Sequence, residues 1–215
     1  MKLWSGVLSP FSAKVRIALA EKRLGYETLE VPWSRKTLWG PKPPEFLAVS
    51  PRGQVPVLID GDVTLHDSTV ICEYLEDRYP EPPLFPTSAA ARARCRQLED
   101  EADYAMGQEV VPLIRELFTK TGEAVRDTAS VAAASEALRR RYGALEKALA
   151  SGVYLCGDLF TVADIATFLV VGFASTFGTS PGDQQRSLRA WLERVQARPT
   201  VAREFAAMTR AAATA

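Results

Sequence analysis

The amino-acid sequence predicts an α+β N-terminal domain with the element order βαβ–ββα, followed by an all-α helical-bundle C-terminal domain. Short β-like runs and helical runs alternate in residues 1–80, whereas no segment after about residue 88 is typical of a strand. Four prolines in seven residues, from Pro80 to Pro86, lie between the two parts. Because such a segment continues neither a helix nor a central strand, it predicts a linker between domains at 1–80 and 88–215.

The first half of the N-terminal domain is predicted as strand, helix, strand. Lys2–Ser5 is the first short strand. Ser9 and Pro10 open a helix, because serine is a favoured N-cap and proline suits the first helical position. The helix ends near Leu24, just before a glycine, and Thr28–Val31 forms the second strand.

The second half is predicted as a hairpin and a helix. A proline-containing loop and a short helical turn near residues 45–48 come first. Val57–Ile59 and Val63–Leu65 are strands joined by an Asp-Gly turn, which is typical of hairpins. Asp67 or Ser68 caps the next helix. The complete order of elements is the thioredoxin-like arrangement.

The C-terminal domain is predicted from apolar stripes at helical spacing. One stripe lies within residues 106–117, where Pro112 predicts a kink or break, and another lies within residues 131–149. A last helix is expected through residues 188–199, and the alanine-rich tail behind it is expected to fray.

Thr161 and Asp164 have the spacing of a capping box, in which the side chain at the third helical position reaches back to the N-cap N–H. The segment that follows is apolar on nearly all sides, so it predicts the buried centre of the domain. Both residues are therefore interpreted as structural.

Composition excludes several classes of function. Lysine plus arginine (26) equals aspartate plus glutamate (26), so no basic surplus indicates binding to nucleic acid or to an anionic membrane. The most apolar stretch, Ile165–Ala174, is shorter than the ~20 residues that span a bilayer. Three dispersed cysteines and a single histidine, His66, argue against a metal site, a disulfide framework and a histidine-based triad. A reducing, cytoplasmic location is expected.

Four motifs together resemble the signatures of the cytosolic glutathione transferase family. They occur in the family's order over nearly the whole chain: SPFSAKVRIALAEK (9–22), SPRGQVPVL (50–58), HDS with YLEDRYP (66–80) and TVAD (161–164). Serine at position 9 is similar to the serine-type groups (theta, zeta, phi and bacterial relatives). The resemblance implies a glutathione transferase that uses glutathione as co-substrate, attacks a small hydrophobic electrophile and forms a homodimer.

Ser9 is the predicted catalytic residue. A free thiol has a pKa of ~8.5, and only its thiolate attacks electrophiles. Lowering that pKa by ~2 units requires ~2.7 kcal/mol of preferential stabilisation of the anion. A hydroxyl hydrogen bond to a charged acceptor supplies ~1.5–3 kcal/mol and the N-terminus of a helix ~0.3–1 kcal/mol, so Ser9 at the start of a helix suffices without a general base. The alternatives are that Ser9 only caps the helix, or that Ser12 is the activating hydroxyl.

Residues 54–56 are predicted to bind the peptide backbone of glutathione. The resemblance implies a cis peptide bond between Val55 and Pro56, which leaves the Val55 N–H and C=O to pair with the cysteinyl backbone by strand addition. Gln54 is expected to assist. An ordinary strand start, where proline is tolerated, is the alternative.

The two ends of glutathione are assigned to three further residues. Asp67 and Ser68, at a helix start, offer N–H groups and a hydroxyl to the γ-glutamyl carboxylate. Lys42 is expected to meet the glycyl carboxylate. Simple capping, and a solvated surface lysine, are the alternatives.

The second substrate is left open by the sequence. The stretch from Pro32 to Trp39 is bulkier than expected of this loop and predicts a reshaped entrance to the site. Isomerisation, ether cleavage or dehalogenation with glutathione, and a binding member without activity, are the alternative functions, because fold alone does not fix function.

Overall fold

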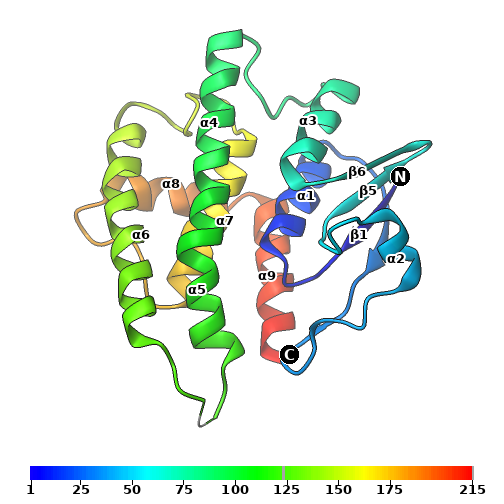
Figure 1. Cartoon of the computed structure of the whole chain (residues 1–215). Helices are drawn as coiled ribbons and strands as arrows, with labels where there is room; N and C mark the ends of the chain where they lie inside the picture. Colours follow the sequence, from blue (N-terminus) through cyan, green and yellow to red (C-terminus); the bar gives the residue numbers. More distant parts are fainter. Residues whose placement is uncertain (123, 215) are drawn as a thin grey trace. The chain divides into compact units, whose positions relative to one another are not determined.

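The computed structural model describes residues 1–122 and 124–214 (Figure 1). It divides into two compact units, one made of Met1–Leu84 with the segment from Pro199 onward, the other of Phe85–Arg198. The first unit holds a small mixed sheet with helices and the second is helical, so the predicted fold class is confirmed. The domain limits 1–80 and 88–215 stay a prediction.

The sheet of the first unit has the strand order β2-β1-β5-β6. Its strands are β1 (Lys2–Ser5), β2 (Glu27–Glu30), β5 (Val57–Asp60) and β6 (Val63–His66). β1 runs parallel to β2, because the helix between them returns the chain, and antiparallel to β5, whereas β5 and β6 form the predicted hairpin.

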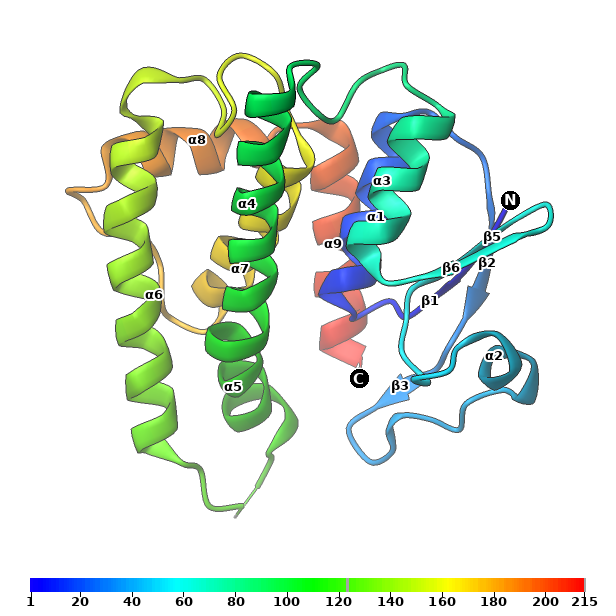
Figure 2. The same cartoon turned by 45° about the horizontal axis from the view of Figure 1, so that its top comes forward.

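Helices cover both faces of this sheet. Figures 1 and 2 show α1 (Pro10–Glu21) and α3 (Ser68–Arg78) on one face, with α2 (Pro44–Val49) on the other side. Successive strand residues face opposite ways, so paired Leu3 and Leu58 point to one face and paired Trp4 and Val57 to the other.

A short hairpin occupies the stretch from Pro32 to Trp39, which the sequence predicts only as a bulky loop. β3 (Trp33–Ser34) pairs with β4 (Leu38–Trp39), which places the two tryptophans opposite each other. The Trp39 ring packs against the cluster formed by Val31, Phe46 and Val57. Burial of part of this large aromatic side chain stabilises the hairpin, whereas a polar loop would lack this contribution.

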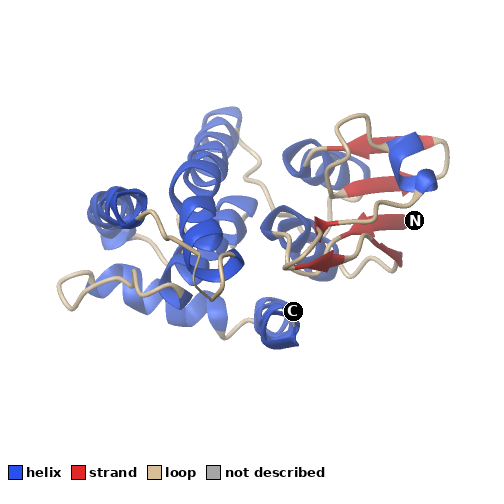
Figure 3. Cartoon of the chain, turned by 60° about the horizontal axis from the view of Figure 1, so that its bottom comes forward, coloured by secondary structure: helices blue, strands red, loops and turns tan. Residues whose placement is uncertain are grey.

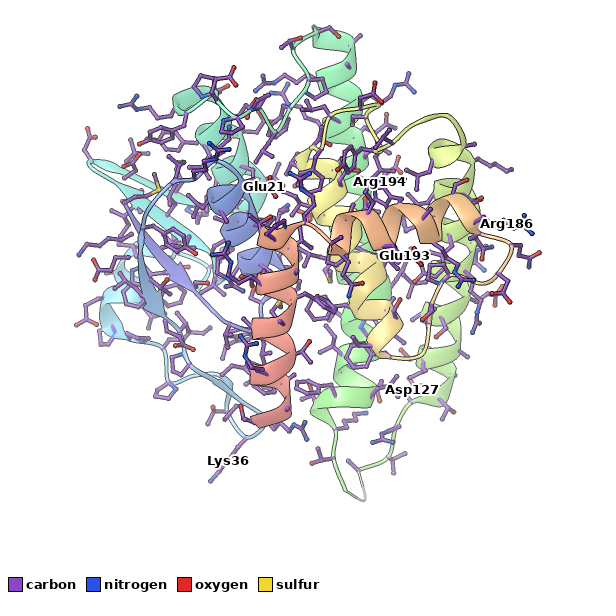
Figure 4. All side chains as sticks on the ribbon, turned by 180° about the vertical axis from the view of Figure 1, so that it is seen from behind. Glu21, Lys36, Asp127, Arg186, Glu193 and Arg194 are labelled. Atoms are coloured by element: carbon purple, nitrogen blue, oxygen red, sulfur yellow. The ribbon has the colours of Figure 1, made fainter. Side chains whose placement is uncertain are left out.

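The alanine-rich tail does not fray; this prediction was wrong. α9 (Pro199–Thr214) is a regular helix that lies beside α1, and α8 ends before it at Gln196. Figure 4 shows Glu21 of α1 beside the start of α9, where its carboxylate accepts a hydrogen bond from Thr200. A second bond, from Arg16 to Glu204, joins the same two helices. These contacts supply the tertiary stabilisation that a short helix needs in water.

A buried ion pair holds the end of the first unit. The Lys22 Nζ atom lies 2.7 Å from Glu76 and donates to the carbonyl oxygens of Tyr79 (2.7 Å) and Pro82 (3.0 Å). Glu76 also accepts the N–H of Leu84 at 3.0 Å. Each charge is therefore paired and hydrogen-bonded, which a buried charge requires, and the predicted linker is fastened to α1 and α3.

The second unit is drawn as helices and loops in Figure 3. Its helices are α4 (Ala89–Ala105), α5 (Val111–Leu113), α6 (Thr128–Ala148), α7 (Val162–Thr176) and α8 (Arg186–Gln196), with a 3₁₀ turn at Leu149–Ser151. The kink or break predicted at Pro112 does not interrupt the helical chain, because Pro112 lies within α5, and wider π-helical turns at Met106–Val110 and Ile114–Thr119 flank it.

α7 forms the predicted buried centre, and its start is fixed by Asp164. The Asp164 carboxylate accepts the N–H of Thr161 (2.9 Å), as the capping box predicts, and also the Thr161 hydroxyl (2.9 Å). It further accepts the N–H of Leu155 (3.0 Å) and the indole N–H of Trp191 (2.8 Å). Burial raises the pKa of this carboxyl group, whereas the four donors act in the opposite direction.

Helices long and apolar enough to cross a membrane are absent from the described part of the chain.

Candidate functional site

The sheet brings three of the predicted segments to one end of its strands. Trp4, Val57 and His66 are aligned in one row across β1, β5 and β6. Just beyond this row, β1 leads to Ser9, the chain enters β5 from the Val55–Pro56 bond, and β6 leads into Ser68. The site residues predicted from separate motifs therefore lie at the same end of the sheet.

Ser9 is the N-cap of α1. Its Oγ accepts the N–H of Ser12 at 3.2 Å, and the residue is 4% exposed. The oxygen thus serves the helix as an acceptor, while its O–H remains a donor for a group placed at the helix start. Capping and donation to a thiolate are compatible in this geometry.

Ser12, the alternative hydroxyl, lies within the first turn of α1. It is fully buried, and its Oγ accepts the N–H of Gly6 at 3.4 Å. The two serines are linked in two ways. The Ser12 N–H donates to the Ser9 Oγ, and the Ser12 Oγ accepts the N–H of Gly6, three residues before Ser9.

The Val55–Pro56 peptide bond is cis, as the resemblance implied. The ladder between β5 and β6 ends at Val57 and His66, so Val55 lies beyond the last strand pair. Within residues 1–122 and 124–214, no hydrogen bond uses the Val55 N–H or C=O. Gln54 is held by its backbone, which exchanges two hydrogen bonds with the Ser50 hydroxyl at 2.9 and 3.0 Å, and its side chain is exposed.

Asp67 caps α3 from an unusual backbone conformation, with φ of 82°. Aspartate tolerates this left-handed region better than most residues, and such strain is often concentrated at functional sites. The Asp67 carboxylate accepts the N–H groups of Thr69 (2.9 Å) and Val70 (3.4 Å). Ser68 follows as a buried residue, 5% exposed, at the first position of the helix.

Lys42 is brought to the loop before the cis-proline. Its Nζ atom lies 3.1 Å from the position that a Cβ atom would take on Gly53, whose φ is 60°. The ammonium group therefore lies close to the segment that leads into Val55, although Val55 is 13 positions after Lys42 in the sequence.

Two features of this site were not identified from the sequence as site residues. The Trp39 ring covers Gly6 so closely that a Cβ atom there would lie 2.0 Å from a ring carbon. A side chain at position 6 is therefore excluded while Trp39 holds its place. The second feature is the guanidinium group of Arg16, which binds the Ser5–Val7 loop.

Clusters of three or more histidine, cysteine, aspartate or glutamate side chains able to hold a metal ion do not occur among the described residues. Cys72 and Cys95 are buried and Cys156 is half-buried. The thiols of Cys95 and Cys156 interact with each other in the second unit, which holds none of the predicted glutathione-binding residues.

An open groove of about 450 Å³ lies in the second unit, between α4 and α6. It is lined by Leu98, Glu101, Glu109, Ala137, Arg140, Arg141, Ala144, Leu145 and Ala148. Its walls carry opposite charges, and Arg141 binds Glu109 at 2.9 Å. None of the predicted glutathione-binding residues lines it.

Family models match both parts of the chain. Residues 3–83 match the model of the glutathione S-transferase N-terminal domain, and residues 102–199 match that of the glutathione S-transferase C-terminal domain.

Individual relatives agree with this match. Glutathione S-transferase 3 of Zea mays is 33% identical over 214 residues, which cover 97% of this chain and 94% of that protein. FtsZ-localized protein A of Caulobacter vibrioides is 30% identical, with 89% and 85% covered. The crystal structure of a glutathione S-transferase from Rhodospirillum rubrum F11 has a TM-score of 0.82 at 32% identity and covers 93% of this chain and 89% of its own.

Proposed function

Because this chain belongs to the glutathione S-transferase family, we propose that it binds glutathione beside the Trp4–Val57–His66 row and holds the thiol as a thiolate through Ser9. The observation that carries the proposal is the position of the Ser9 hydroxyl. It lies at the N-terminus of α1, and its oxygen accepts the Ser12 N–H, so the O–H is available as a donor to an anion. Both the hydroxyl and the helix end favour the charged form of the thiol.

The remaining site residues fit the ends of a tripeptide. Val55 offers a backbone N–H and C=O just beyond the last β5–β6 residue pair, which suits the extended cysteinyl unit. Ser68 offers an N–H and a hydroxyl to the γ-glutamyl carboxylate, and the Asp67 carboxylate suits the γ-glutamyl ammonium group. Lys42 suits the glycyl carboxylate, with Gln54 beside it.

In this reaction the thiolate sulfur attacks an electrophilic carbon of a small hydrophobic substrate. A carbon–sulfur bond forms, and a leaving group departs or an adjacent atom takes up a proton. The helical unit supplies the surface for that substrate in the proposal, and the cytoplasm supplies reduced glutathione. Isomerisation, ether cleavage and dehalogenation begin with the same thiolate. A panel of haloaromatics, epoxides, aryl ethers and peroxides distinguishes ether cleavage and dehalogenation from the other conjugation reactions.

Glutathione affinity tests the proposed binding site. Ser68→Ala is expected to raise the Kd for glutathione about tenfold, because one hydrogen bond to a carboxylate is lost, while the pKa of the bound thiol changes much less. Calorimetric titration gives the first quantity and ultraviolet thiolate absorbance the second. Thr64→Ala, an exposed change on β6, is the control. Unchanged affinity in the Ser68 variant would refute the assignment of the γ-glutamyl end.

A glutathione-binding protein without transferase activity is the second candidate, because a relative at 30% identity bears the name FtsZ-localized protein A. Retention on immobilised glutathione without turnover of any electrophile in the panel would favour it. Turnover that depends on Ser9 excludes it.

A two-fold symmetric homodimer is the expected assembly. The first unit is expected to dock against the helices around residues 98–117 of its partner, beside the groove between α4 and α6. Light scattering should give twice the 23.5 kDa mass of one chain. Ala144→Arg, an exposed groove position on α6, should favour the monomer, whereas Ala132→Arg on the same helix should not. A monomer mass for the unaltered protein would contradict the proposal.

A further inference from the structure

The Arg16 side chain uses all five of its N–H donors within the first unit. Nε (2.9 Å) and Nη2 (2.5 Å) donate to one carboxylate oxygen of Glu204 on α9. Nη1 donates to the Ser5 hydroxyl and to the Gly6 carbonyl (3.0 Å), and Nη2 also donates to the Val7 carbonyl (3.1 Å). The guanidinium group is therefore fixed in position and orientation, since its planar fork has no donor left to rotate toward another partner.

These bonds reach the proposed catalytic residue through one atom. The carbonyl oxygen of Gly6 accepts the Arg16 Nη1 bond and also the N–H of Ser9, at 3.0 Å. The position of that carbonyl therefore sets where the Ser9 backbone begins the helix. The Trp39 ring holds the same residue from another direction, because it packs on the Gly6 Cα.

Glu204 determines which way the guanidinium group faces. The side chains of Arg16 and Glu204 are only 11% and 14% exposed, so water replaces neither partner easily. With Glu204 absent, two donors of Arg16 lose their partner, and the group can turn away from the loop toward solvent. The loss would loosen Gly6 without removing any residue near the thiol.

We propose that the Arg16–Glu204 pair positions Ser9 for thiolate stabilisation, so that the C-terminal helix α9 is part of the glutathione-activating machinery. This inference rests on the proposed role of Ser9. Arg16 and Glu204 are positioning residues, because they act through the Gly6 carbonyl and do not contact the substrate. A hydrogen bond to an anion weakens steeply with distance and angle, and small displacements of a catalytic group have large effects on rate.

The test compares Glu204→Ala with Thr200→Val. Both changes remove a bond between α9 and α1, but only Glu204 is connected to Gly6. In Glu204→Ala, the pKa of bound glutathione is expected to rise by about one unit and kcat to fall about tenfold, with little change in KM for glutathione. Thr200→Val should lower the melting temperature without changing either quantity. Glu204→Gln keeps an acceptor oxygen and should restore part of the loss.

A double variant separates this inference from the proposed function. Once Ser9 is alanine, Glu204→Ala should add almost nothing to the change in thiol pKa, because the residue it positions has been removed. If Glu204→Ala leaves the pKa and kcat unchanged in a protein where Ser9→Ala alters both, the positioning role is wrong and the role of Ser9 stands. If Ser9→Ala itself has no effect, the proposed function fails first. An additive double variant would assign Glu204 a purely structural role.

Discussion

Replacing Ser9 with alanine is expected to lower glutathione conjugation about 10- to 100-fold. The lost bond is a charge-assisted hydrogen bond of ~1.5–3 kcal/mol, and each 1.36 kcal/mol corresponds to a tenfold change in rate. The pKa of bound glutathione should rise, which is measured as a loss of ultraviolet thiolate absorbance near neutral pH. Binding should change far less, because Ser68 and Val55 hold other parts of the tripeptide.

Ser12→Ala is the control for this prediction. Ser12 is fully buried and its Oγ accepts the Gly6 N–H, so its loss should lower stability more than it changes the thiolate. Loss of the thiolate in Ser12→Ala together with its retention in Ser9→Ala would show that Ser12 activates the thiol. Ser9 would then be only a helix cap.

Replacing Asp164 with alanine is expected to destabilise the protein by about 4 kcal/mol. The capping box alone predicts ~1–2 kcal/mol. In the structure, however, the carboxylate also accepts the Leu155 N–H and the Trp191 indole N–H, and the residue is fully buried. Each buried donor left without an acceptor costs about 1–3 kcal/mol. The apparent melting temperature should fall by roughly 8–16 °C in a chain of this length.

Variants that remove a single donor measure how much each hydrogen bond contributes to the destabilisation expected for Asp164→Ala. Thr161→Val and Trp191→Phe each remove one of the four donors while keeping the carboxylate, and each should cost about 1–2 kcal/mol. Glutathione affinity of the folded fraction should stay constant in all three variants. A fall in affinity with an unchanged melting temperature would contradict the structural assignment of Asp164.

The elements predicted correctly from the sequence have local signals. Serine followed by proline identified the start of α1, and an Asp-Gly pair identified the β5–β6 hairpin. The spacing of Thr161 and Asp164 identified the start of α7. The cis bond before Pro56 followed from the family resemblance, because periodicity and propensity do not distinguish cis from trans.

The elements that were missed depend on contacts between distant residues. The alanine content of the tail predicted fraying, whereas α9 is ordered by partners about 180 residues earlier, Glu21 and Arg16. The β3–β4 hairpin has strands of two residues, and its stability comes from Trp39 on a distant cluster. Arg16 was not identified as a site residue for the same reason, because the sequence motif around it does not indicate which distant atoms its guanidinium group binds.

The packing of α9 against α1 has a consequence for biosynthesis. The unit that carries Ser9 is discontinuous in the chain, so a ribosome delivers its last helix only after the whole second unit has been made. Until then Arg16 lacks its carboxylate partner Glu204, and the face of α1 that packs on α9 is uncovered. Closing a loop of 188 residues is slow compared with local helix formation, so maturation of the thiol site should be the late step in the appearance of activity.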